Sequence, residues 1–149
     1  MAKPVSVAVK LGTGLDRLAP ATAICAFTTV KGAICRSFFS PPTVEQRLKL
    51  RIPITPEFTA IVSGHGKTKA YLHRFNLTDK PMCPCSEGEQ SVEHLIYPYI
   101  CRILEPHRSP MIKHITTRGG IWPPTNNELV TKYLNAFSKF VKSIDFSKL

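Results

Sequence analysis

The chain has 149 residues, and its apolar fraction of 43% permits a single small domain with a packed core. It contains 20 lysines and arginines but only 10 acidic residues, and the resulting formal charge of +10 favours a polyanionic partner, either nucleic acid or an acidic membrane surface. No apolar run reaches about 18 residues, so no membrane-spanning helix is expected. The charge together with the motifs below favours nucleic acid as the partner, and no membrane partner is predicted.

The five cysteines are irregularly spaced, and their number is odd. Because no secretory signal precedes them, a disulfide framework is not expected, and a reducing nuclear or cytoplasmic compartment fits better. Cys25 and Cys35 have apolar neighbours in the sequence and are interpreted as buried or disordered thiols.

Residues 1–40 are mostly small, apolar and basic, with Asp16 as the only acid. This composition also fits a mitochondrial presequence, although no amphipathic arginine-rich helix is evident. We interpret residues 1–40 as a poorly ordered segment or a remnant of a preceding domain. The 13 prolines of the chain favour short helices joined by stiff loops, so residues 41–149 are expected to form a mainly α-helical tail domain.

Two helix starts follow Pro41. Thr43 and Gln46 have the spacing of a capping box, which predicts a short helix over residues 44–50. At residues 55–57 a threonine cap, a proline and an acid predict a second helix. Its apolar residues share one helical face and are Phe58, Ile61 and Val62.

The glycine-rich residues 63–66 end that helix, and the run 67–75 predicts the next one. The turn lacks the pattern of a nucleotide-triphosphate loop, but the N-terminus of the helix after it can receive one backbone phosphate. A packing turn with a solvated basic face is the competing interpretation. The residues expected to contact nucleic acid here are Lys67, Lys69, His73 and Arg74.

Further along, residues 79–90 predict a turn-rich loop, and Ser91 caps another short helix. Pro98, Pro106 and Pro110 are expected to keep the following elements short. The last helix is predicted to start at Asn126 or Asn127 and to run to residue 144, with an apolar stripe typical of a core face. The stripe consists of Leu129, Val130, Tyr133, Leu134, Phe137, Phe140, Val141 and Ile144.

Three thiols and one imidazole in the turn-rich region have the residue types of a closed tetrahedral zinc shell: Cys83, Cys85, His94 and Cys101. Such a shell leaves no open position for a metal-bound water, so it predicts a structural zinc ion without zinc catalysis. The zinc would order a segment that has too few apolar residues to order itself. Buried free thiols beside an ordinary helix histidine are the alternative.

Four short motifs follow one another in an order that resembles a known family. They are Ser-Gly-His-Gly at 63–66, Tyr-Leu-His-Arg-Phe at 71–75, Cys-Pro-Cys at 83–85 and Glu-His-Leu at 93–95. Their order resembles the region after the ribonuclease H domain in polyproteins of insect-type, LINE-type non-LTR retrotransposons. The resemblance covers roughly residues 30–149, including Trp122-Pro123 and the final helix.

The resemblance implies a zinc-knuckle-like element over residues 83–101, which helps to hold RNA or target DNA near a reverse transcriptase. It carries the ligand role to Cys83, Cys85 and His94. Cys101 lies farther from the histidine than in the family, because Pro98-Tyr99 resembles a two-residue insertion. Residues 14–19 faintly resemble the last ribonuclease H element, so Asp16 would be a stranded catalytic residue that cannot cleave RNA alone.

The sequence therefore predicts a basic nucleic-acid-binding fragment with no catalytic residue of its own. A second hypothesis is a non-catalytic interaction segment or decayed remnant, in which Phe137 and Phe140 dock on missing domains of the parent polyprotein. A third is a reverse transcriptase or ribonuclease H activity inherited from that parent, against which the scarcity of carboxylates argues.

Overall fold

The computed structural model describes residues 33–39, 49–97 and 101–149. These residues are mainly helical, as predicted, and the one β-like feature among them is an isolated antiparallel bridge between Met82 and Glu89. No helix in the described ranges has the length and apolar character needed to cross a bilayer. The elements are α2 (Ala33–Phe39), α4 (Pro56–Ser63), α5 (Lys69–His73), α6 (Val92–Ile96), the 3₁₀ helix η1 (Arg102–Leu104), α7 (Glu105–Thr117), α8 (Asn126–Thr131) and α9 (Leu134–Ser143).

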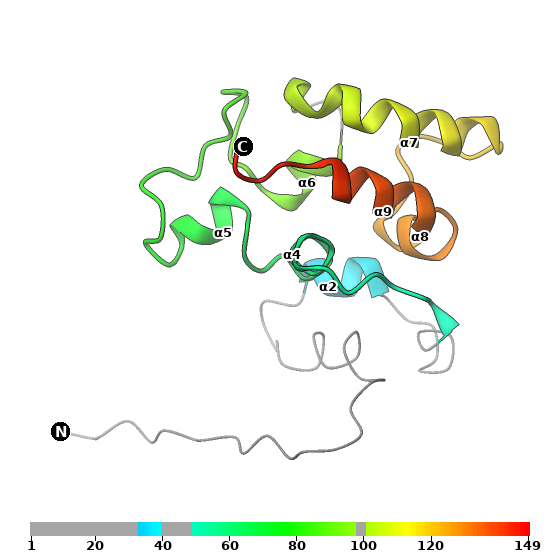
Figure 1. Ribbon diagram of the computed structural model, residues 1–149, viewed down its shortest axis with the longest axis horizontal. Coiled ribbons are helices and arrows are strands. Elements are labelled where there is room, and N and C mark those ends of the chain that lie inside the picture. Colours follow the sequence, from blue (N-terminus) through cyan, green and yellow to red (C-terminus); the bar gives the residue numbers. More distant parts are fainter. Residues whose placement is uncertain (1–32, 40–48, 98–100) are drawn as a thin grey trace, which may run out of the picture.

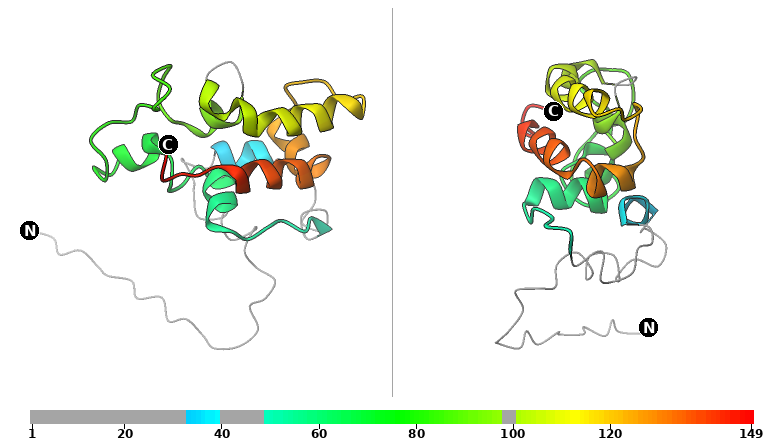
Figure 2. Two further views of the ribbon diagram at one scale, coloured as in Figure 1. Left: turned by 45° about the horizontal axis from the view of Figure 1, so that its top comes forward. Right: turned by 90° about the vertical axis from the view of Figure 1, so that its right-hand side faces the viewer.

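Helix α9 is the centre of the molecule. It lies between α7 on one side and α4 on the other, while α2 packs against α8 and α4 (Figures 1 and 2). Phe137 of α9 stacks on Phe38 of α2, with ring centroids 5.7 Å apart, and meets the edge of Phe58 of α4 at 5.4 Å. These three buried rings connect α2 and α4, near the start of the described residues, with α9 near their end.

Helix α4 forms as the sequence predicts. The Thr55 hydroxyl accepts a hydrogen bond from the Phe58 N–H at 3.2 Å, and Pro56 occupies the first turn, where no backbone donor is needed. The helix ends at Gly64, whose left-handed φ of 70° lets its N–H reach the Ala60 carbonyl. The predicted face is buried, with Phe58, Ile61 and Val62 each at most 3% exposed.

Helix α2 belongs to the segment for which poor order or a remnant was expected. Within the described residues 33–39 it contributes Cys35, Phe38 and Phe39 to the core. Cys35 is buried but takes part in a disulfide, so its interpretation as a free thiol was wrong. Residues 1–32, including Asp16 and Cys25, and most of the predicted helix at 44–50 lie outside the described residues.

Helix α7 is longer than predicted. Pro106 and Pro110 were expected to keep this region short, yet α7 runs for 13 residues and contains both. Pro106 lies in the first turn, where a helix tolerates proline, whereas Pro110 removes one backbone hydrogen bond. Burial of Met111 and Ile115 against the core offsets that loss.

The predicted last helix is two helices, because the backbone leaves helical geometry at Tyr133, where φ is −120° and ψ is 22°. The Tyr133 N–H bonds to the Glu128 carbonyl, five residues back, and α9 then starts in a new direction. The bend allows Leu129 of α8 and Phe137 of α9 to be buried in one core, both at 0% exposure.

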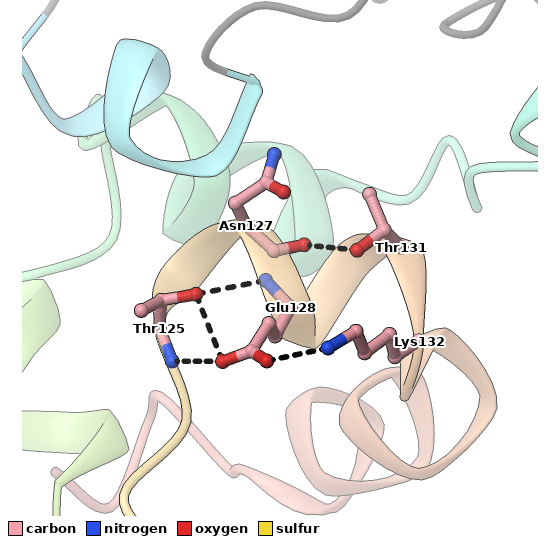
Figure 3. Close-up of polar contacts among 5 residues, drawn as sticks. All are labelled: Thr125, Asn127, Glu128, Thr131 and Lys132. Carbon is pink, nitrogen blue, oxygen red and sulfur yellow. Dashed lines mark hydrogen bonds and ion pairs between the residues drawn. The ribbon is translucent and has the colours of Figure 1, made fainter.

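The N-cap of α8 is Thr125, not Asn126 or Asn127. Thr125 and Glu128 form a reciprocal capping box, in which the Thr125 hydroxyl accepts from the Glu128 N–H and the Glu128 carboxylate accepts from the Thr125 N–H (Figure 3). The asparagines instead face α2: Asn126 donates to the Ser37 hydroxyl at 2.8 Å, and Asn127 donates to the Phe38 carbonyl at 3.0 Å.

Candidate metal centre

A tight hairpin presents the first two sulfurs of the predicted metal site. The Cys83 N–H donates to the Gly88 carbonyl at 2.8 Å, and the Ser86 N–H donates back to the Cys83 carbonyl at 3.0 Å. Ser86 and Gly88 both have positive φ, so the turn folds sharply beneath Cys85. Cys83 and Cys85 are therefore held by backbone hydrogen bonds of the hairpin.

The other two candidate ligands come from separate elements. His94 lies on α6, whose start is fixed by the Ser91 hydroxyl accepting from the His94 N–H at 3.2 Å. Cys101 directly precedes η1. Residues 98–100, which include the supposed insertion, lie outside the described part of the chain, but Cys101 itself reaches the other ligands.

The four predicted ligands form one compact thiol–imidazole cluster, made of Cys83, Cys85, His94 and Cys101. Their ligand atoms all lie within 4.8 Å of one another. The Sγ atoms of Cys83 and Cys101 are 3.8 Å apart, and Sγ of Cys85 is 3.1 Å from Nε2 of His94. A tetrahedral zinc ion with Zn–S bonds of about 2.3 Å separates neighbouring sulfurs by roughly 3.8 Å, so the spacing suits that ion.

The cluster is shielded from water, which affects its protonation. Cys83, His94 and Cys101 are at most 3% exposed, and Cys85 is half-buried. Burial raises the pKa of the Cys83 thiol to about 12. The pKa of His94 is lowered, mainly by burial and to a smaller extent by the nearby charge of Arg108, and this keeps the imidazole neutral. A divalent cation would reverse the preference of the Cys83 thiol for the protonated form, and the neutral imidazole can bind the cation directly.

The four residues predicted to contact nucleic acid are not equivalent. Lys67 forms an ion pair with Glu57 at 3.0 Å and lies 5.8 Å from the centre of the Phe146 ring. Lys69 is half-buried in α5, while His73 and Arg74 are exposed at its end.

The predicted phosphate-binding N-terminus is already occupied. Helix α5 starts at Lys69 and is only five residues long. The Lys69 N–H donates to the side-chain oxygen of Gln90 at 2.8 Å, and the Ala70 N–H donates to the Gln90 carbonyl at 3.3 Å. These two donors are therefore satisfied within the protein and are not available to the phosphate that was expected there. Gln90 was not singled out by the sequence, because its role depends on two segments meeting.

The final helix does not present its phenylalanines to solvent. Phe137 and Phe140 are 0% and 2% exposed, so the exposed docking face expected from them is wrong. A groove between α7 and α9 of about 360 Å³ was not anticipated either. His107 and Lys139 lie at its edge, with Met111 and Phe140 among its apolar lining.

No protein-family model, curated protein or solved structure matches the chain. The described residues define its class by geometry alone: a mainly helical protein in which three cysteines and one histidine lie close enough to bind a metal ion.

Proposed function

We propose that this chain is a zinc-stapled, helical nucleic-acid-binding module and that it has no catalytic activity of its own. The observation that carries the proposal is the compact thiol–imidazole cluster, in which all four ligand atoms lie within 4.8 Å of one another. Thiolates and imidazole favour zinc over magnesium or calcium, which prefer oxygen ligands. With four protein ligands zinc has no open position, so its role would be structural.

The metal would also support the basic face beside it. Gln90 lies between the hairpin and α6, is 1% exposed, and holds the first N–H groups of α5. Ordering the hairpin therefore orders α5. That helix carries Lys69 and ends at the exposed His73 and Arg74.

Aromatic rings accompany these charges. The ring centroids of Tyr71 and Phe75 are 4.9 Å apart, and those of Tyr71 and His65 are 5.4 Å apart. Phe75 is 47% exposed. Cationic side chains beside partly exposed aromatic rings suit single-stranded nucleic acid, because its phosphates attract the cations and its bases stack on the rings. Binding of this kind depends little on sequence.

Metal content is the first test. Native mass spectrometry should find one zinc ion per wild-type chain and none in the Cys83→Ser and Cys101→Ser variants. His73→Gln is the control, because His73 is an exposed histidine outside the cluster and its loss should leave zinc bound. A wild-type chain that does not retain zinc would remove the structural basis of the proposal.

Nucleic-acid binding is tested by fluorescence anisotropy with a labelled single-stranded oligonucleotide. The affinity should fall as salt rises, with a log–log slope of roughly 0.7 per phosphate contact. Changing Lys69 and Arg74 to glutamine should weaken binding and reduce that slope. The matched control changes Lys113 and Arg118 of α7 and its C-cap to glutamine, which removes the same charge from exposed positions. Equal losses in both double variants would place binding elsewhere.

The order of the motifs resembles the tail of a LINE-type non-LTR retrotransposon polyprotein, and we propose that origin for the chain. In that setting the module would hold RNA or target DNA for the polymerase of the parent. The alternative, an interaction segment or decayed remnant, is favoured by exposed apolar side chains near the hairpin: Phe75, Leu77 and Met82. Concentration-dependent self-association without nucleic-acid binding would support this alternative.

A further inference from the structure

Arg108 is a charged side chain in the interior of the protein. It lies on the buried face of α7 between Leu104 and Met111 and is 0% exposed. Its Nη1 atom donates to the Tyr97 carbonyl at 2.7 Å, and its Nη2 atom donates to the Cys101 carbonyl. Its Nε has no hydrogen-bond partner. The guanidinium thus binds the backbone at Tyr97, directly after α6, and again at Cys101.

Two carbonyl partners do not neutralise the positive charge of Arg108. No carboxylate of the described residues lies within ion-pair distance of it; the ion pairs found there use other cations. The acid that acts on Arg108 through space is Glu105, which is exposed one turn earlier on α7. A buried charge without a counter-charge is strongly unfavourable, so a compensating anion is expected nearby.

The thiol–imidazole cluster can supply that anion once it binds a metal. Arg108 donates to the backbone carbonyl of Cys101, one of the four ligands, so its guanidinium lies beside the cluster, and its charge helps to lower the pKa of His94. Zinc contributes two positive charges, three cysteine thiolates contribute three negative charges, and a neutral histidine adds none. The loaded cluster therefore has a net charge of −1, which the single charge of Arg108 balances.

We propose that Arg108 is the counter-charge of the metal–thiolate centre and, through the Cys101 carbonyl, positions the last ligand. The proposal rests on the metal site argued above. It makes Arg108 a positioning residue whose effect on metal affinity depends on the charge of the ligand shell. A merely structural arginine would affect affinity equally whatever the charge of the shell.

A double-mutant cycle separates these two roles. Cys85→His turns the shell into two cysteines and two histidines, which holds zinc or cobalt with no net charge. The half-buried position of Cys85 leaves room for that change. Cobalt(II) affinity is measured at one pH by optical titration against a competing chelator, for the wild type, Arg108→Gln, Cys85→His and the double variant.

Arg108→Gln should weaken cobalt binding by roughly 10–100-fold in the wild-type shell, as other outer-shell losses do. In the neutral shell of Cys85→His the same substitution should change affinity by only about threefold or less. Arg108→Lys, which keeps the charge but not the two-pronged donor, should recover most of the lost affinity. The exposed Arg102→Gln is the control and should leave affinity unchanged.

Equal losses in the charged and neutral shells would overturn the proposal, as would Arg108→Lys binding no better than Arg108→Gln. If Arg108→Gln does not fold, Arg108→Met takes its place in both shells, because this neutral apolar side chain removes the charge without burying an unpaired polar group. A wild-type chain that binds no cobalt would instead refute the metal site itself, a distinct result.

Discussion

At the scale of single residues, Gly64 and Gly66 flank the same turn but differ in their surroundings. Both have left-handed φ values, of 70° and 79°. A Cβ atom on Gly64 would lie 2.6 Å from Cδ1 of Ile34 in α2, whereas a Cβ on Gly66 would meet nothing within 4 Å. An alanine at Gly66 therefore adds backbone strain alone, whereas an alanine at Gly64 adds the same strain and a steric clash.

We predict that Gly66→Ala lowers the free energy of unfolding by roughly 1–2 kcal/mol, the usual cost of a left-handed alanine. Gly64→Ala should cost at least about 1 kcal/mol more, because the added methyl group presses on Ile34. Urea denaturation of both variants checks this. Equal costs would mean that α2 does not pack against the end of α4 in solution.

The candidate ligands could be predicted from the sequence, but the residues that support them could not. Cysteine and histidine are recognisable because few residue types bind zinc. Arg108 and Gln90 carry no such signal, since arginine and glutamine are usually exposed. Their roles follow from burial and from contacts between distant segments, which a single sequence does not reveal.

At the scale of elements, the capping box of α8 offers a local test (Figure 3). Thr125→Ala removes the acceptor of the Glu128 N–H and should lower the free energy of unfolding by about 1 kcal/mol. Thr131→Ala is the control, because its hydroxyl only donates back to the Asn127 carbonyl within the helix. A Thr125→Ala variant as stable as this control would contradict the assigned cap.

The carboxylate of the same box predicts a pH dependence. The hydrogen bond from Lys132, followed by those from Thr125, lowers the pKa of Glu128 from 4.5 to about 2. A lowered pKa in the folded state means that Glu128 stabilises the fold fully above pH 4.5 and loses this effect as pH falls toward 2. The stability difference between wild type and Glu128→Gln should therefore shrink across that range. A constant difference in thermal unfolding would argue against the interaction.

Helices with strong end signals were predictable, and helices without them were not. Thr55 and Pro56 predicted the start of α4, and Ser91 predicted the start of α6. Helix α7 was missed because its buried face contains Arg108 and its interior contains Pro110, both of which argue against a core helix. The break between α8 and α9 has no glycine or proline to mark it; burial of both apolar faces in one core determines it.

At the scale of the whole molecule, removal of metal should act unevenly. The hairpin and α5 contribute few buried apolar side chains, and no residue of α5 is buried, whereas α4 and α9 share an aromatic core. We expect a chelator to lower the melting temperature and to increase amide exchange first in residues 69–91. Amides of α9 should stay protected longest. Uniform loss of protection, or none, would show that the cluster does not order this half of the molecule.

Contacts between α2 and α8 also affect how the chain folds as it is made. Asn126 and Asn127 hold Ser37 and Phe38, which were synthesised 89 residues earlier. Until α8 and α9 emerge from the ribosome, Phe38 and Phe58 lack the Phe137 ring that covers them. This part of the chain therefore completes its folding only after α9 has been synthesised, and nascent chains that stop before Leu134 should expose these rings to chaperones or to one another.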